Sequence, residues 1–220
     1  MIIPLASVFG IFNDMITNFL NVPGSEIWVY VLLGTIIFVE TGLVFFPFLP
    51  GDSILFFVGS MTAMHPKQLS MVTLVVSLTI LAFLANLLNY EIGRKFGETI
   101  PKHPKLGRFL KDEYLEEARR FFDKYGASAI FLGRFMPIIR TIVPFTAGTA
   151  QMPHKKFVLF NFLGGLAWVV VATVAGYFFG GLAFVKAHFE LIMMAIILVS
   201  LLPAVITGMK KYFDKKKLAA

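Results

Sequence analysis

Long apolar stretches dominate the chain and are separated by short polar segments. The candidate stretches cover residues 27–64, 69–90, 127–152, 157–184 and 189–209. Because about 20 apolar residues are needed to cross a bilayer as a helix, simple membrane spans are predicted at 69–90, 157–179 and 189–209. The pattern therefore predicts an all-α integral membrane protein.

Two of the stretches do not fit one straight crossing. Residues 27–64 are too long for a single span, and both 27–64 and 127–152 are interrupted by residues typical of helix breaks. The predicted breakers are Pro47, Pro50, Gly51, Pro137 and Pro144. A proline lacks an N–H and leaves the carbonyl four residues earlier without its helical partner. At membrane depth such backbone is tolerated only inside protein or beside a water-filled cavity.

Composition agrees with a membrane protein, and the charge distribution orients it. The chain is 57% hydrophobic, has 25 Phe and no Cys, and its first 66 residues contain no Lys or Arg. The absence of Cys excludes disulfides and thiolate catalysis. Basic residues cluster at 94–124, at 155–156 and at 210–217. Basic segments flanking membrane spans lie on the cytoplasmic side, so the C-terminus is predicted to be cytoplasmic and nucleic-acid binding is not expected.

This orientation predicts an inverted repeat. Both ends of 127–152 are cytoplasmic by charge, so this segment enters and returns, and 27–64 does so from the opposite face. We expect one membrane domain, 1–220, with a substrate site near the midplane where the two broken helices meet. Its parts are an N-terminal interfacial helix (1–26), a first re-entrant hairpin plus span (27–91), a cytoplasmic linker (92–126), a second re-entrant hairpin plus span (127–181), a final span (188–209) and a basic cytoplasmic tail (210–220).

The linker contains one clear amphipathic helix, predicted at 112–125. Acidic residues come early and basic residues late, which suits the helix dipole, and Gly126 is a natural stop. We expect this helix to lie on the cytoplasmic membrane surface.

Four charges lie inside the apolar segments: Glu40, Asp52, Arg134 and Arg140. Each costs about 2.5–3.5 kcal/mol at the centre of a membrane helix, so they must find one another, water or a ligand. One hypothesis is that the two arginines bind a phosphate, while the two acids bind protons or a cation. The alternative is a pair of structural salt bridges, and Asp52 has a further interpretation as the N-cap of a returning half-helix.

Three further residues are candidates for lining the same cavity: Asn86, Asn161 and Trp168. Their alternative role is helix packing. The sequence has no H-E-x-x-H, G-x-S-x-G or Walker motif and no metal-ligand spacing. An enzyme is therefore not expected, and neither a cofactor nor a metal is predicted.

Ordered motifs give the chain a family resemblance that runs from about residue 27 to 181. They are Glu40-Thr41-Gly42, Pro47-x-Leu49-Pro50-Gly51-Asp52-Ser53, Asn89-Tyr90-x-Ile92-Gly93-Arg94, Gly133-Arg134-Phe135-x-Pro137-x-x-Arg140-x-x-x-Pro144, Asn161-x-x-Gly164, Trp168 and Gly176-Tyr177. In these the chain closely resembles the DedA family, the bacterial branch of the VTT-domain group. The resemblance implies a transporter with two opposed re-entrant helices, linked to undecaprenyl phosphate recycling and the proton motive force.

The same resemblance maps the family's acidic pair onto Glu40 and Asp52 and its arginine pair onto Arg134 and Arg140. The chain departs from the pattern at Asn86, where several members carry an acid. The predicted function is proton-coupled movement of a phosphorylated lipid, undecaprenyl phosphate first, across the bacterial inner membrane. The alternatives are a proton-coupled antiporter of small ions and a passive scramblase of phosphatidylethanolamine. The expected partners are the lipid substrate and the bilayer, and a homodimer is left open.

Overall fold

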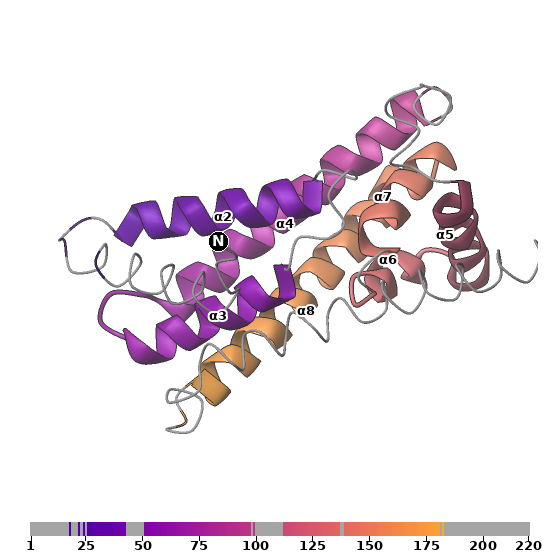
Figure 1. Cartoon of the computed structure of the whole chain (residues 1–220). Coiled ribbons are helices and arrows are strands. Elements are labelled where there is room, and N and C mark those ends of the chain that lie inside the picture. Colours follow the sequence, from indigo (N-terminus) through magenta and orange to yellow (C-terminus); the bar gives the residue numbers. More distant parts are fainter. Residues whose placement is uncertain are drawn as a thin grey trace, which may run out of the picture.

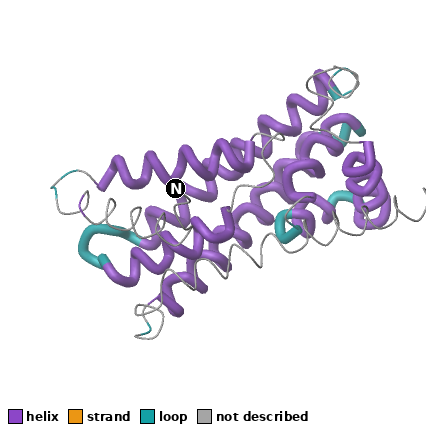
Figure 2. Tube along the Cα trace, viewed as in Figure 1, coloured by secondary structure: helices purple, strands orange, loops and turns teal. Residues whose placement is uncertain are grey.

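Helices joined by short turns make up the part of the chain that forms the site (Figures 1 and 2). The structure, a computed structural model, describes residues 18, 22, 24, 26–42, 51–97, 99, 112–136, 139–180 and 182, and these contain no strand. The helices are α2 (Glu26–Gly42), α3 (Gly51–Met64), α4 (Met71–Phe96), α5 (Asp112–Tyr125), α6 (Ser128–Gly133), α7 (Ile139–Thr149) and α8 (His154–Gly180).

Helices α4 and α8 are long and apolar enough to cross a membrane. With 26 and 27 residues, each is about 40 Å long at about 1.5 Å per residue. Helix α4 begins after Ser70, whose hydroxyl accepts the N–H of Thr73 at 3.4 Å, and it ends with Arg94 and Lys95 in its last turn. Ser is a favoured N-cap, and basic residues suit a helix C-terminus.

One face of α4 is apolar and outward-facing along nearly its whole length. Large aliphatic side chains recur every four residues and are all exposed: Val72, Val76, Ile80, Leu84 and Leu88. Helix α8 exposes a comparable set that includes Leu159, Phe162, Leu163, Val171 and Phe178. A helix in the core of a soluble protein would bury such residues, and continuous exposed apolar surface marks a contact with lipid or protein. The surface therefore agrees with an α-helical membrane protein.

The two broken apolar stretches each contain two helices. Helix α2 ends at Gly42 and α3 begins at Gly51, and the two run antiparallel side by side (Figure 1). In the second stretch α6 ends at Gly133 and α7 begins at Ile139. Pro47, Pro50 and Pro137 lie outside the described residues.

Pro144 does not break its helix, contrary to the prediction. Helix α7 runs from Ile139 through Pro144 to Thr149. The missing N–H removes one backbone hydrogen bond, to the carbonyl of Arg140. Almost every residue of α7 is buried against its neighbours, and this packing holds the helix together across the lost bond.

The short helices cross the long ones through two matched pairs of glycines. Gly59 of α3 faces the backbone of Thr173 in α8, and Gly176 of α8 faces the backbone of Phe56 in α3. In the second crossing, Gly148 of α7 faces Tyr90 in α4, and Gly93 of α4 faces Phe145 in α7. In all four cases a Cβ would collide with a backbone carbonyl oxygen.

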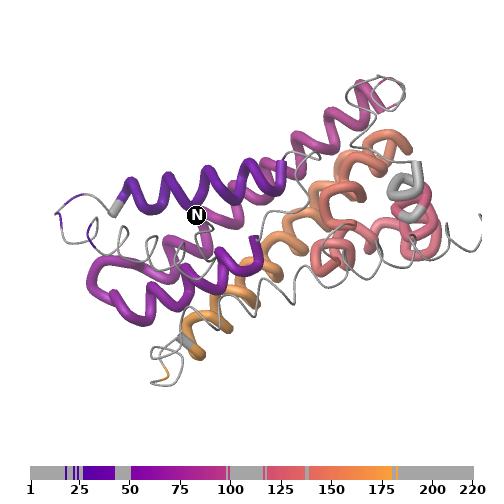
Figure 3. The backbone as a smooth tube through the Cα atoms, viewed as in Figure 1, coloured from indigo at the N-terminus to yellow at the C-terminus, as the bar shows by residue number. Residues whose placement is uncertain are grey.

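A hydroxyl accompanies each crossing. Ser60, after Gly59, donates to the carbonyl of Gly176 at 3.0 Å, and Thr149, after Gly148, is 3.4 Å from the carbonyl of Gly93. The same set of contacts thus occurs at both crossings. Helix α3 packs on α8 and helix α7 packs on α4, so the two halves of the chain interlock (Figure 3).

The buried apolar residues form two clusters, with polar residues between them. The first joins α2, α3, the first half of α4 and the middle of α8, around Leu33, Leu55 and Leu78. The second joins the end of α4, α5, α6, α7 and the beginning of α8, around Tyr90 and Phe145.

The linker helix is confirmed at the predicted bounds, 112–125. It ends at Gly126, whose φ of 55° is in the left-handed region that favours glycine. The predicted N-terminal helix, final span and basic tail lie outside the described residues.

Candidate functional site

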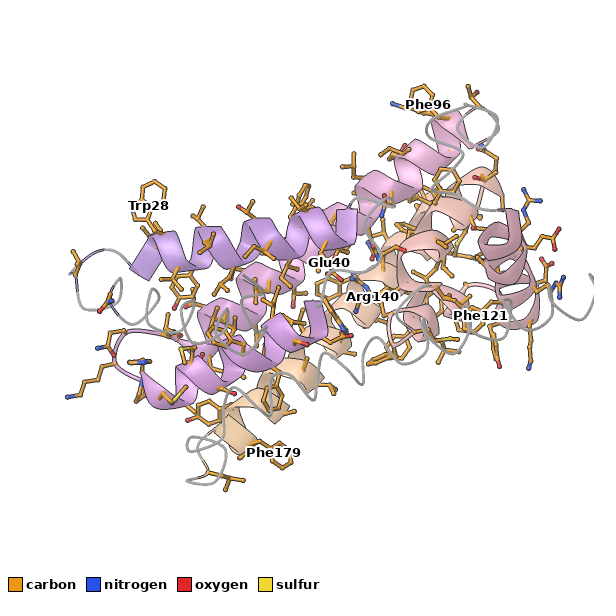
Figure 4. The ribbon with its side chains drawn as sticks, in the orientation of Figure 1. Trp28, Glu40, Phe96, Phe121, Arg140 and Phe179 are labelled. Atoms are coloured by element: carbon orange, nitrogen blue, oxygen red, sulfur yellow. The ribbon has the colours of Figure 1, made fainter. Side chains whose placement is uncertain are left out.

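Three of the four charges of the apolar segments meet in one ion-pair cluster, and Figure 4 shows two of them, Glu40 and Arg140, near the middle of the molecule. Arg140 donates through Nη2 to Oε1 of Glu40 and through Nη1 to Oδ1 of Asp52, the latter at 2.8 Å. One guanidinium therefore joins two carboxylates that belong to different helices. The prediction that acids of the first broken stretch and arginines of the second come together is confirmed for these three residues.

Helix ends place these groups. Glu40 lies in the last turn of α2, while Asp52 and Arg140 are the second residues of α3 and α7. A helix N-terminus favours negative charge, so the place of Asp52 is favourable. Glu40 is an acid at a helix C-terminus and Arg140 is a base at a helix N-terminus, so both places are unfavourable. The ion pair between them offsets these two costs. The carboxylate of Glu40 also receives the Thr41 hydroxyl at 3.3 Å and fills the space where Gly51 has no side chain.

Asp52 is not merely a helix cap. It lies inside the first turn of α3, and its hydrogen bonds reach Arg140 of α7 and Trp168 of α8. Its side chain is 35% exposed, whereas that of Glu40 is 1% exposed. Of the two acids, Asp52 is therefore the more accessible.

Arg134 is buried without a carboxylate partner among the described residues. It is 2% exposed, and its Nη2 donates to the carbonyl of Ala82 at 3.0 Å and to Oδ1 of Asn161 at 3.3 Å. Its Nε has no hydrogen-bond partner within the described part of the chain. A buried charge held only by neutral groups is costly, and this guanidinium is therefore suited to receive an anion.

Two amides complete the surroundings of Arg134. Asn86 donates through Nδ2 to Oδ1 of Asn161 at 3.1 Å, and Asn161 donates to the carbonyl of Phe83 at 3.0 Å. The Oδ1 of Asn86 is buried and lacks a partner among the described residues. Neutral Asn86 therefore supplies no countercharge.

Trp168 contacts both arginines and one acid. Its Nε1 donates to Oδ1 of Asp52 at 2.6 Å. The Cζ atoms of Arg134 and Arg140 lie 5.6 and 5.3 Å from the ring centroid, within the range of a cation–π attraction. All seven charged and polar residues singled out in the sequence are thus connected in one network, while their roles in transport stay predictions.

The sequence reasoning missed the residues that make room for this network. A Cβ at Gly165 would lie 3.1 Å from Nη2 of Arg134, and one at Gly164 would lie 3.3 Å from its Cγ. The signal was a pair of glycines inside an otherwise bulky apolar span. No group of three or more His, Cys, Asp or Glu suited to a metal occurs among the described residues.

Comparisons with known proteins find similar sequences among membrane proteins. A profile of the VTT domain matches residues 46–178. Protein DedA of Escherichia coli K12 is 42% identical over 180 residues, which cover 82% of each chain. An uncharacterized membrane protein of Mycobacterium tuberculosis H37Rv is 42% identical over 177 residues, covering 80% of this chain and 77% of its own. The inner membrane protein YghB of E. coli K12 is 35% identical over 191 residues, 86% of each chain. No solved structure matches the chain.

Proposed function

The chain belongs to the DedA family of VTT-domain membrane proteins, and from that premise we propose that it transports a phosphorylated lipid, undecaprenyl phosphate first, across the bacterial cytoplasmic membrane. The observation that carries the proposal is the buried Arg134 guanidinium, which has no carboxylate partner among the described residues. A phosphate supplies the missing negative charge, and the guanidinium fork matches its oxygens. The hydrocarbon tail stays in the bilayer beside the exposed apolar faces of α4 and α8.

The proposed route into the site is between two re-entrant hairpins. Helix α3 has 14 residues, about 21 Å at about 1.5 Å per residue, which is shorter than the hydrocarbon core of about 30 Å. Its charged first turn lies near the middle of the molecule, where α7 also begins with Arg140. We infer that α3 and α7 each start near the middle of the bilayer and end at one of its surfaces. Two hairpins that enter and return from opposite faces have this geometry, which is the arrangement of inverted-repeat transporters.

Proton coupling follows from competition for Arg140. In the observed arrangement its charge is shared by Glu40 and Asp52. Protonation of either acid weakens this pairing and lets Arg140 turn to a phosphate already held by Arg134. Release of the phosphate lets Arg140 return to the carboxylates, and the proton leaves. Each cycle thus exchanges one anionic partner of Arg140 for another.

The test is lipid flipping in proteoliposomes, with undecaprenyl phosphate and phosphatidylethanolamine as separate substrates. Arg134→Ala and Arg140→Ala are each expected to slow flipping of the phosphorylated lipid by about 30-fold or more, because losing one partner of a buried charged contact costs about 2 kcal/mol or more. The matched control is Arg120→Ala, an exposed arginine on α5 that pairs with Glu116 at 3.3 Å.

Three results would contradict the proposal. Wild-type protein that flips no phosphorylated lipid removes the substrate assignment. Flipping that is unchanged when the proton gradient is collapsed favours a passive scramblase, and gradient-driven movement of small ions without lipid flipping favours an antiporter.

A further inference from the structure

Trp168 contacts the charged residues of the site, which a residue that only packs would not need to do. It is buried on α8 and belongs to the first apolar cluster, yet three of the four site charges touch it. We propose that Trp168 is a positioning residue of the phosphate site, which keeps Asp52 in place and the two arginines together while Arg140 changes partner. This inference rests on the proposed function.

The indole N–H supplies the first half of this role. Tryptophan has one polar hydrogen and only donates, and here it donates to the Asp52 oxygen that also accepts from Arg140. When Arg140 turns to a phosphate, that oxygen keeps the Trp168 hydrogen bond. Asp52 therefore stays where Arg140 can return to it, and the exchange is reversible.

The ring supplies the second half. The guanidiniums of Arg134 and Arg140 are like charges and repel each other when no phosphate lies between them. Both of their Cζ atoms lie within 5.6 Å of the Trp168 ring centroid. The negative faces of an aromatic ring attract cations, so the indole offsets this repulsion in the empty site. The phosphate then meets two arginines that are already close together.

The apolar cluster fixes the position of the ring. Trp168 belongs to the apolar cluster whose other members come from α2, α3, α4 and α8. On the polar side it faces Asp52 at the start of α3 and Arg140 at the start of α7. A rigid ring on a continuous helix thus spans the boundary between the apolar cluster and the charges.

Two substitutions separate the role of the indole N–H from the role of the ring in the flipping assay. Trp168→Phe keeps an aromatic face and removes the N–H, so we expect KM for undecaprenyl phosphate to stay within about twofold while kcat falls by about tenfold. Trp168→Leu removes both, so KM should also rise by about tenfold. A residue that only packs would lower the amount of folded protein in both variants without this division between KM and kcat, and that result would overturn the inference.

Intrinsic fluorescence gives a test that needs no substitution of Trp168. The chain has two tryptophans, and Trp28 is 64% exposed on α2 at the periphery of the molecule (Figure 4). In Trp28→Phe the tryptophan emission comes from Trp168 alone. Titrating this variant with undecaprenyl phosphate in detergent should give a saturable change in emission, which undecaprenol does not produce and which is lost when Arg134→Ala is added.

The outcomes distinguish the two claims. If Trp28→Phe flips the lipid but its emission does not respond, Trp168 is not at the phosphate site and this inference fails while the proposed function stands. If wild-type protein neither binds nor flips the phosphorylated lipid, the proposed function fails and takes the inference with it.

Discussion

Both the stability of the charged network and the proposed transport depend on Arg140. It joins Glu40 and Asp52, two acids on different helices, and removing one partner of a buried ion pair leaves an uncompensated charge that costs about 3–5 kcal/mol. In the proposed function, the same contact occupies the guanidinium that a phosphate would bind. The proposal therefore requires that the ion pairs of Arg140 be strong enough to form and weak enough to be exchanged.

Glu40→Gln tests this competition. The amide keeps the size of the side chain and removes its charge, so Arg140 loses one of its two anionic partners. We expect KM for the phosphorylated lipid to fall by about three- to tenfold, because a charge-assisted hydrogen bond is about twice as strong as a neutral one. Stimulation of flipping by a proton gradient should weaken in the same variant.

The measurement is flipping rate against lipid concentration, with and without the gradient. Glu116→Gln is the matched control, because Glu116 is an exposed acid on α5 whose ion-pair partner is also exposed. A Glu40→Gln protein with wild-type KM and a wild-type response to the gradient would exclude competition for Arg140.

At the scale of elements, the glycine crossings fix how the short helices lie on the long ones. Helix α3 meets α8 at Gly59 and Gly176, and α7 meets α4 at Gly148 and Gly93. Without side chains at these points the backbones approach closely, as in other membrane helix interfaces built on small residues. This contact fixes where α3 lies along α8 and where α7 lies along α4, and so the positions of Asp52 and Arg140 in their first turns.

Gly59→Ala and Gly148→Ala should each destabilise the protein, and by similar amounts, because each new Cβ meets a backbone carbonyl that cannot turn away. Overpacking of this kind costs about 1–3 kcal/mol, which should lower the Tm in detergent by several degrees. Gly34→Ala is the control, since its Cβ meets only the flexible end of the Leu81 side chain. Equal Tm values for all three variants would show that the crossings have no special packing requirement.

At the scale of the whole molecule, the charges lie between two apolar clusters, and the halves of the chain are interlocked. Helix α3 of the first half packs on α8 of the second, and α7 of the second half packs on α4 of the first. Neither half therefore has a complete set of packing partners by itself. We expect the network around Arg140 to form only when the whole chain has folded.

Membrane orientation can be tested with single cysteines, because the natural chain contains none. Lys67 is exposed in the turn between α3 and α4, and Lys155 is exposed in the first turn of α8. The distribution of basic residues predicts that Lys67 is periplasmic and Lys155 cytoplasmic. In intact cells, a membrane-impermeant maleimide should label Lys67→Cys but should label Lys155→Cys only after permeabilisation. Labelling of both from one side would refute the inverted arrangement.

Much of the architecture was available from the sequence because it depends on local energetics. The sequence predicts the apolar helices over 69–90 and 157–179, the helix at 112–125 and its end at Gly126, and the structure has helices at these places. That the charges of the two broken segments come together also followed from the cost of isolated charges in hydrocarbon. These features need only the composition and order of neighbouring residues.

Tertiary structure alone decided which charges are partners. The sequence left both arginines equivalent, yet Arg140 pairs with both acids and Arg134 contacts only neutral groups and the Trp168 ring among the described residues. Partner choice depends on separations of a few ångströms between four helices, and no local pattern encodes these distances. The same holds for Pro144, which a buried helix accommodates, and for the glycines whose role appears only when a second backbone lies against them.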